Sequence, residues 1–169
     1  MKKRYILAII FGVLVLVTAI AIFGFSSETG DKSGGRSDKV IDIIASIIIR
    51  DYDQMTPMEK SEIIRKFAYP VRKSAHIAEY AILSAFVAVF VWVFTSKEYF
   101  TLTIPSVFSF LFAMCDELVL QRATSGRSGQ FSDVLIDLIG IILGTLAVYI
   151  FMRFYWRGAR LKSDENKNS

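Results

Sequence analysis

The chain has 169 residues, of which 53% are hydrophobic, and its long uncharged runs favour an integral membrane protein over a soluble domain. Its net charge of +4 is small and lies near the ends of these runs, which indicates contact with a membrane surface and argues against nucleic-acid binding. A single cysteine excludes an intrachain disulfide, and a single histidine excludes a multi-histidine metal centre, so we expect no metal and no cofactor.

Residues 5–25 form the first apolar run, which contains no charge and is long enough to span the hydrocarbon core of about 20 residues. The preceding MKKR and the small residues Ala19 and Ala21 would also fit a signal peptide. Because the run continues past that cleavage pattern, we expect a retained first membrane helix.

The segment after the first run is predicted to contain a loop and two short helices. Residues 26–39 are rich in Gly, Ser and charge and are predicted to be a polar loop. Over 40–53, polar residues recur at every fourth position among isoleucines, which predicts an amphipathic helix on the bilayer surface or against the bundle. A second short helix is predicted over 57–69, ending at Pro70.

Three further apolar runs complete an all-α membrane protein with four transmembrane helices, whose first extracytoplasmic loop carries the short amphipathic helices. A single domain is predicted over 1–157, with spans at 5–25, 74–95, 99–118 and 132–156. The polar segment 158–169 is predicted to be a disordered tail. An even number of spans places both termini on one side of the cell membrane, and the basic residues at both ends predict that this side is cytoplasmic.

Ionisable residues interrupt the apolar pattern in three segments, 72–80, 115–118 and 126–137. A charge at the centre of a bilayer costs about 2.5–3.5 kcal/mol on insertion scales, so such groups usually mark a paired site or a pathway. Four alternating spans bring all three segments to one face of the bundle, predicted to be extracytoplasmic. The candidate functional cluster consists of Arg72, Lys73, His76, Glu79, Tyr80, Asp116, Glu117, Arg127, Asp133 and Asp137.

The spacing within two of these segments predicts which helix faces point inward. The polar residues of 72–80 recur at i, i+4, i+7 and i+8, which places them on one stripe of a helix. In the fourth span, Asp133 and Asp137 align with Gly140 and Gly144. This Gly-x-x-x-Gly pattern permits close packing between membrane helices, so the same stripe is predicted to face a neighbour.

Together these motifs resemble the VanZ-like family of bacterial membrane proteins over most of the sequence. The resemblance rests on an early Phe/Ser element (Phe23, Phe25, Ser26, Ser27, Ser33 and Ser37), R-K-x-x-H-x-x-E-Y at 72–80, the acidic pair at 116–117, G-R-x-G at 126–129 and the glycine pattern of the last span. The family often carries a His-Gln pair after the acidic pair, whereas here Gln121 stands without the histidine and is displaced by one residue. Many members also have Asn where this chain has Asp137.

The resemblance implies a link to glycopeptide antibiotics, because the named member of the family lowers susceptibility to teicoplanin. A housekeeping role in the cell envelope is equally natural. The first hypothesis is therefore a non-enzymatic protein that binds a membrane lipid headgroup or cell-wall precursor, with a lipoglycopeptide as a further candidate partner. Arg72, Lys73 and Arg127 would contact phosphate or carboxylate, and Arg127, in a polar loop without evident structural duty, is predicted to serve a ligand or an ion pair.

Three alternatives remain. In a membrane enzyme acting on a lipid-linked phosphate substrate, His76 would exchange protons, Glu79 or Asp116 would orient it, and the Asp116–Glu117 pair could hold a divalent cation through oxygen ligands. The sequence shows no nucleophile with a dedicated base, which disfavours catalysis. The polar residues could also form a purely structural network between helices. An ion pathway is disfavoured because the second and third spans are apolar beyond the cluster, and the oligomeric state is left open.

Overall fold

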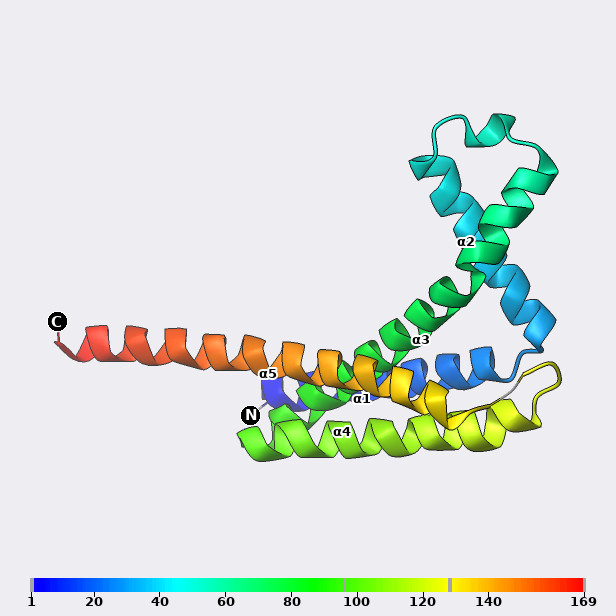
Figure 1. Ribbon diagram of the computed structural model, residues 1–169. Helices are drawn as coiled ribbons and strands as arrows, with labels where there is room; N and C mark the ends of the chain where they lie inside the picture. Colours follow the sequence, from blue (N-terminus) through cyan, green and yellow to red (C-terminus); the bar gives the residue numbers. More distant parts are fainter. Residues whose placement is uncertain (1, 96, 128, 169) are drawn as a thin grey trace.

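The computed structural model describes residues 2–95, 97–127 and 129–168, with side chains up to Tyr155. The described residues contain no strand. The elements in chain order are α1 (Lys2–Ser26), α2 (Gly30–Ile48), the short 3₁₀ helix η1 (Tyr52–Gln54), α3 (Pro57–Thr95), α4 (Glu98–Cys115), the π-helix η2 (Asp116–Gln121) and α5 (Phe131–Asn168). The all-α prediction is confirmed (Figure 1).

Four helical segments are long and apolar enough to cross a membrane, which supports a multi-pass membrane protein. They are α1, α3, α4 continued by η2, and α5 as far as Tyr155. Their outer surfaces carry many exposed large apolar side chains, among them Ile9, Leu16 and Ile20 of α1. Such a surface suits a hydrocarbon environment, in which exposed side chains are apolar and every backbone group is paired within the helix.

The first loop contains more helix than the sequence predicts. Helix α2 begins at Gly30, so the loop predicted over 26–39 is wrong beyond Thr29. Glycines are poor helix formers, but here the N–H of Gly30 donates to the carbonyl of Ser125 at 3.1 Å, and Ser37 and Ile41 of α2 are buried. Packing against other parts of the chain therefore overrides the local propensity.

The predicted end of a short helix at Pro70 is also wrong. Helix α3 is continuous from Pro57 to Thr95, and Pro70 lies inside it. A proline removes one N–H donor but does not end a membrane helix that neighbouring segments support. With 39 residues, about 58 Å at 1.5 Å per residue, α3 exceeds a 30 Å hydrocarbon core. Its first part therefore extends beyond the other spans, where α2 crosses it (Figure 1).

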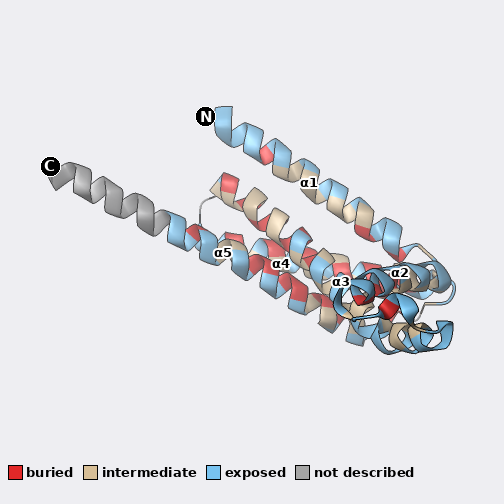
Figure 2. Ribbon diagram, turned by 90° about the horizontal axis from the view of Figure 1, so that it is seen from above, coloured by how far each residue is buried: buried red, intermediate tan, exposed pale blue. Residues whose placement is uncertain are grey.

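Helix α3 is the centre of the bundle and contacts α1, α2, α4 and α5. Figure 2 shows α1 on one side of the molecule, apart from α4 and α5. The core cluster joins Ile22 of α1 to Tyr80, Leu83, Val87 and Val91 of α3, Ala113 of α4, and Val134 and Ile141 of α5. The core is thus a set of apolar contacts arranged around one long helix.

Helices α3 and α5 are in direct backbone contact at Gly140 and Gly144. A Cβ atom on Gly140 would collide with the carbonyl of Ile77, and one on Gly144 with the carbonyl of Ala81. This is the close approach that the Gly-x-x-x-Gly spacing predicts. It fixes the register in which the polar residues of the two helices face each other.

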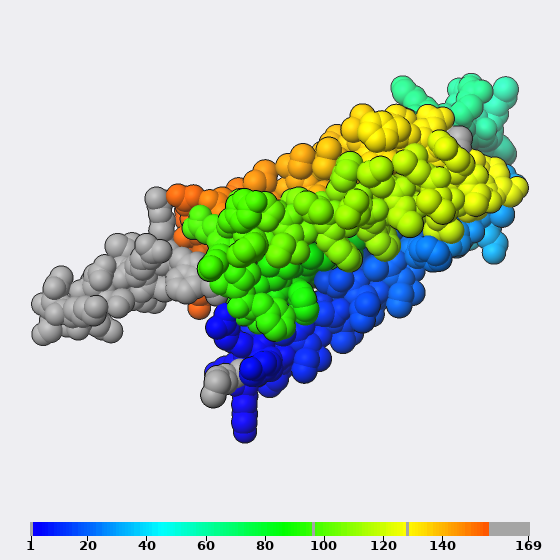
Figure 3. Space-filling model, turned by 90° about the horizontal axis from the view of Figure 1, so that it is seen from below, coloured from blue at the N-terminus to red at the C-terminus, as the bar shows by residue number. Residues whose placement is uncertain are grey.

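The bundle has two distinct ends. At the end called here the far end, the start of α1 lies near the start of α4 and the later part of α5 (Figures 1 and 3). At the opposite end, called here the polar end, the segment after α1 meets the segment that joins η2 to α5 (Figure 3). Helix α5 runs to Asn168, whereas the sequence predicts disorder for 158–169; side chains from 156 onward lie outside the described residues, and that prediction stays a prediction.

Candidate functional site

The polar end brings together all three polar segments of the sequence. His76 and Tyr80 come from α3, Asp116 and Glu117 from η2, and Asp137 from the second turn of α5. The end of α1 adds Ser26, which is buried. The convergence that alternating spans predict is therefore present in the structure.

Two consecutive acids at the start of a π-helix both face inward. In an α-helix, neighbouring residues point about 100° apart. In the wider turn of η2, Asp116 is 3% exposed and Glu117 is 0% exposed. Wider turns of this kind are rare and often occur at functional sites. The sequence predicts an acidic pair here, but it does not predict that both acids are buried in a widened turn.

Asp116 is held by hydrogen bonds from three segments. Its Oδ2 accepts from the hydroxyl of Ser26 at 2.8 Å, from Nε2 of Gln121 at 3.1 Å and from the hydroxyl of Tyr80 at 3.2 Å. These donors lie on α1, η2 and α3. Asp116 therefore joins the helices of the polar end. A structural network of this kind was one of the alternatives for the whole cluster in the sequence analysis.

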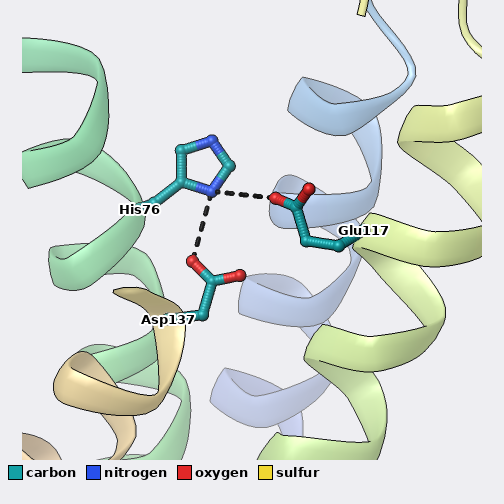
Figure 4. A group of neighbouring side chains, drawn as sticks. All are labelled: His76, Glu117 and Asp137. Atoms are coloured by element: carbon teal, nitrogen blue, oxygen red, sulfur yellow. Dashed lines mark ion pairs between the residues drawn. The ribbon is translucent and has the colours of Figure 1, made fainter. Parts of the chain in front are cut away.

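His76, Glu117 and Asp137 form a second, differently arranged group (Figure 4). Nδ1 of His76 lies 3.3 Å from Oδ1 of Asp137 and 3.6 Å from Oε1 of Glu117. These are ion-pair distances without hydrogen-bond geometry, because Nδ1 has no hydrogen-bond partner among the described residues. The other ring nitrogen points away from both carboxylates (Figure 4). We call these three residues the triad.

Gln121 and Ser26 belong to this site but are absent from the cluster predicted from the sequence. The amide nitrogen of Gln121 donates a short hydrogen bond to Oε1 of Glu117 as well as the bond to Asp116, and its oxygen accepts from Arg127 at 2.8 Å. For Gln121, the signal available in the sequence was its position four residues after Glu117, about one helical turn away. Gln121 orients one oxygen of each acid.

Arg127 has a structural role that differs from the one predicted. Besides Gln121, its guanidinium donates to the carbonyl of Glu28 at 2.9 Å and to that of Phe25 at 2.8 Å. It thereby ties the loop before α5 to the connection between α1 and α2. Burial lowers the pKa of Arg127 from its usual value, and the nearby charge of Arg72 lowers it further. The predicted absence of a structural duty is therefore wrong.

The remaining predicted residues lie around the triad rather than in it. Lys73 pairs with Asp133 at 2.6 Å near the start of α5. Among the described residues, Arg72 and Glu79 make no hydrogen bond or ion pair with the buried acids, but both line a neighbouring cavity. Nε of Arg72 is buried and has no hydrogen-bond partner among the described residues. It is a cationic donor available to a ligand.

Two cavities meet at Arg72, His76 and Arg127, which line both of them. The first has a volume of about 560 Å³ and lies between α2 and α3, beside the end of α1. Its walls combine three arginines and several serines with apolar side chains, including Phe25, Val40, Ile44 and Val71. The second, of about 430 Å³, lies between α3 and the segment before α5 and is lined mainly by polar residues, including Arg65, Lys73 and Gln130.

Fold and site together define a multi-pass helical membrane protein with a buried His–carboxylate triad at one end of the bundle. Residues 11–152, which include every candidate residue above, match the VanZ/LLP1 family. The chain belongs to that family. No curated protein and no solved structure matches the chain.

Proposed function

We propose that this protein binds the anionic headgroup of a membrane lipid or lipid-linked cell-wall precursor at the polar end, and that it thereby lowers susceptibility to lipoglycopeptides such as teicoplanin. The observation that carries this proposal is the position of Arg72. Its buried Nε lacks a partner among the described residues and its side chain lines both cavities. A buried cationic donor without a partner is costly, and a phosphate oxygen would supply that partner.

The lining of the first cavity supports an amphiphilic ligand. Arg36, Arg72 and Arg127 bring positive charge to one side of it, while Val40 and Ile44 of α2 contribute apolar wall. A phosphate headgroup would lie at the arginines, whose forked donors match its geometry. An acyl or polyprenyl chain would lie along the apolar wall. In this proposal the polar end is extracytoplasmic and both termini are cytoplasmic, in the cell membrane.

Arg72→Gln is the sharpest variant for testing this proposal, because Arg127 also holds the fold together. Teicoplanin susceptibility would be measured in a sensitive Gram-positive host that expresses wild type, Arg72→Gln, Arg50→Gln or an empty vector. Arg50 is exposed and follows the end of α2, so it controls for loss of one positive charge between α1 and the membrane-spanning part of α3. Membrane abundance would be quantified in the same cultures.

We expect protection by the wild type and by Arg50→Gln, and its loss in an equally abundant Arg72→Gln protein. Native mass spectrometry of the detergent-purified chain would test the ligand with a polyprenyl phosphate, phosphatidylglycerol and phosphatidylcholine as probes. Retention of the two anionic probes, but not of phosphatidylcholine, supports the proposal. Equal retention of all three by wild type and Arg72→Gln would contradict it.

A second candidate is an enzyme that acts on a lipid-linked phosphate. It is favoured by one observation: the imidazole of His76 lines both cavities and lies beside two buried carboxylates. His76 is thus placed to exchange a proton with a phosphate ester held at Arg72. Release of inorganic phosphate from a polyprenyl diphosphate by wild type, but not by His76→Gln, would favour this alternative over simple binding.

A further inference from the structure

The triad has the geometry of a metal-binding site. One atom each from His76, Glu117 and Asp137 lies within 4.8 Å of the other two. Around a metal bound at about 2.1 Å, neighbouring tetrahedral ligands lie about 3.4 Å apart. The distances from Nδ1 of His76 to the two carboxylates, 3.3 and 3.6 Å, match that spacing. The three side chains come from three different segments, so the arrangement does not follow from local spacing in one helix.

Several polar atoms of the triad lack a hydrogen-bond partner within the described part of the chain. Both oxygens of Asp137, Oε2 of Glu117 and Nδ1 of His76 are buried without a hydrogen bond. Glu117 and Asp137 are fully buried. Buried polar atoms are almost always paired, because an unpaired one costs about 1–3 kcal/mol. Nδ1 of His76 and Oδ1 of Asp137 are two such atoms lying 3.3 Å apart, which indicates a bound group that satisfies them together.

The charge of the triad indicates the sign and size of that group. Two buried carboxylates face a single imidazole, while the nearest lysine, Lys73, is paired with Asp133. Asp116 adds a third buried carboxyl beside them, with its Oδ1 unpartnered among the described residues. A neutral imidazole, two carboxylates and a divalent cation would sum to zero charge, which is the favoured state in a low-dielectric interior.

We propose that His76, Glu117 and Asp137 bind a divalent first-row transition metal ion. One imidazole with two carboxylates suits Mn²⁺, Fe²⁺ or Zn²⁺, whereas Ca²⁺ and Mg²⁺ favour all-oxygen sites. From the sequence we expect no metal, and the cation site considered in the enzyme alternative is the Asp116–Glu117 pair. The structure instead places Glu117 beside His76 of α3 and Asp137 of α5. Asp116 is bonded to Ser26, Tyr80 and Gln121 and connects the helices.

Surrounding residues fit this assignment. Gln121 fixes Oε1 of Glu117 and is itself held by Arg127, which is the outer support that metal ligands usually have. His76 lines both cavities, whereas Glu117 and Asp137 line neither, so an ion would reach the triad past the imidazole of His76. Three protein ligands leave at least one coordination position for water or for a ligand oxygen.

This inference goes beyond the proposed function and does not depend on it. Metal binding requires only the triad, whereas headgroup binding requires Arg72. If both hold, the ion and the arginine would contact one anionic ligand from two sides. Metal binding by an Arg72→Gln protein that has lost protection would separate the two proposals.

The test uses the full chain purified in detergent and stripped with EDTA. Mn²⁺ and Zn²⁺ would be titrated separately, with bound metal measured after desalting by elemental mass spectrometry and thermal unfolding followed in parallel. We expect about one ion per chain and a rise in melting temperature for wild type. His76→Ala and Asp137→Asn should weaken binding more than 100-fold, since loss of outer support alone costs about 10–100-fold.

Asp133→Asn is the matched control because it makes the same change one turn earlier on α5, at an acid paired with Lys73. It should bind metal as wild type does. Melting of the metal-free variants shows that they fold, so loss of binding cannot be ascribed to unfolding. No saturable binding by wild type, or equal binding by all variants, would overturn the proposal.

Discussion

The two ends of the bundle treat their polar side chains in opposite ways. At the far end, Arg4 donates to the carbonyl of Val93 at 2.7 Å, and the exposed hydroxyl of Tyr149 donates to Glu98 and accepts from Arg153. At the polar end, fully buried Glu117 and Asp137 keep oxygens without partners among the described residues. These polar side chains of the far end are exposed and have partners. Those of the polar end are buried, and some of their atoms have no partner.

This difference separates polar groups that stabilise the fold from polar groups whose burial destabilises it. A structural ion pair or hydrogen bond leaves few unpaired atoms, because unpaired buried groups destabilise the folded state. Side chains that break this rule usually lie at functional sites. Asp116 has three donors on one oxygen, which fits a structural role, whereas Asp137 has none on either oxygen, and we therefore expect a functional role for Asp137.

The largest effect is expected for Asp116→Ala, which tests the structural side of the comparison. It removes the acceptor shared by Ser26, Tyr80 and Gln121, so buried donors lose their partner. We expect a loss of about 2–4 kcal/mol in the free energy of unfolding. Thermal unfolding in detergent measures it, with Asp116→Asn, which keeps one acceptor oxygen, as the milder variant. Unchanged stability would show that the polar end is not joined through this carboxylate.

Asp137→Asn should change stability in the opposite direction. In metal-free protein the substitution replaces a buried carboxylate that has no hydrogen bond with a neutral amide. We expect an increase of about 1–2 kcal/mol in the free energy of unfolding, together with loss of function, as happens where activity depends on a destabilising group. The same unfolding assay, performed in EDTA, measures it. A destabilised Asp137→Asn protein would place Asp137 with Asp116 on the structural side.

Arg127→Lys distinguishes geometry from charge at the polar end. Lysine keeps the charge but cannot reach Gln121 and the carbonyls of Phe25 and Glu28 with a planar fork. We expect a loss of about 1 kcal/mol and faster proteolysis of the α1–α2 connection. Arg122→Lys, at a neighbouring exposed arginine, is the control and should leave the cleavage rate unchanged. Equal rates in both variants would mean that Arg127 acts through charge alone.

The smallest effect is expected at the far end, from Tyr149→Phe. The hydroxyl bonds of Tyr149 to Glu98 and Arg153 are exposed, and exposed polar pairs contribute little. We expect a change within about 0.5 kcal/mol in the unfolding assay. A larger loss would remove the contrast between the two ends.

The spans and their convergence could be predicted because they depend on long apolar runs and on the alternation of the chain through the membrane. The contact of Gly140 and Gly144 with α3 follows in the same way from small-residue spacing. Helix α2 could not be predicted from Gly30, because its start depends on a hydrogen bond to Ser125, far away in sequence. The continuity of α3 through Pro70 likewise depends on its neighbours.

The site was predicted as a set of residues but not as two groups with different roles. Spacing along α3 places His76 on the inner stripe, yet spacing cannot show that Asp137 lacks a donor while Asp116 has three. Nor could it show that Arg127 is used by backbone carbonyls of the α1–α2 connection. These are properties of atoms brought together by tertiary packing.

The π-helix η2 has a consequence for how the chain tolerates insertions. An extra residue in a regular helix turns everything beyond it by about 100°. The widened turn of Asp116–Gln121 can absorb one such residue, which the displacement of Gln121 implied by the family resemblance would require. Gln121 consequently still reaches both acids. We therefore expect a one-residue difference in length at this point to leave α5 aligned with α3.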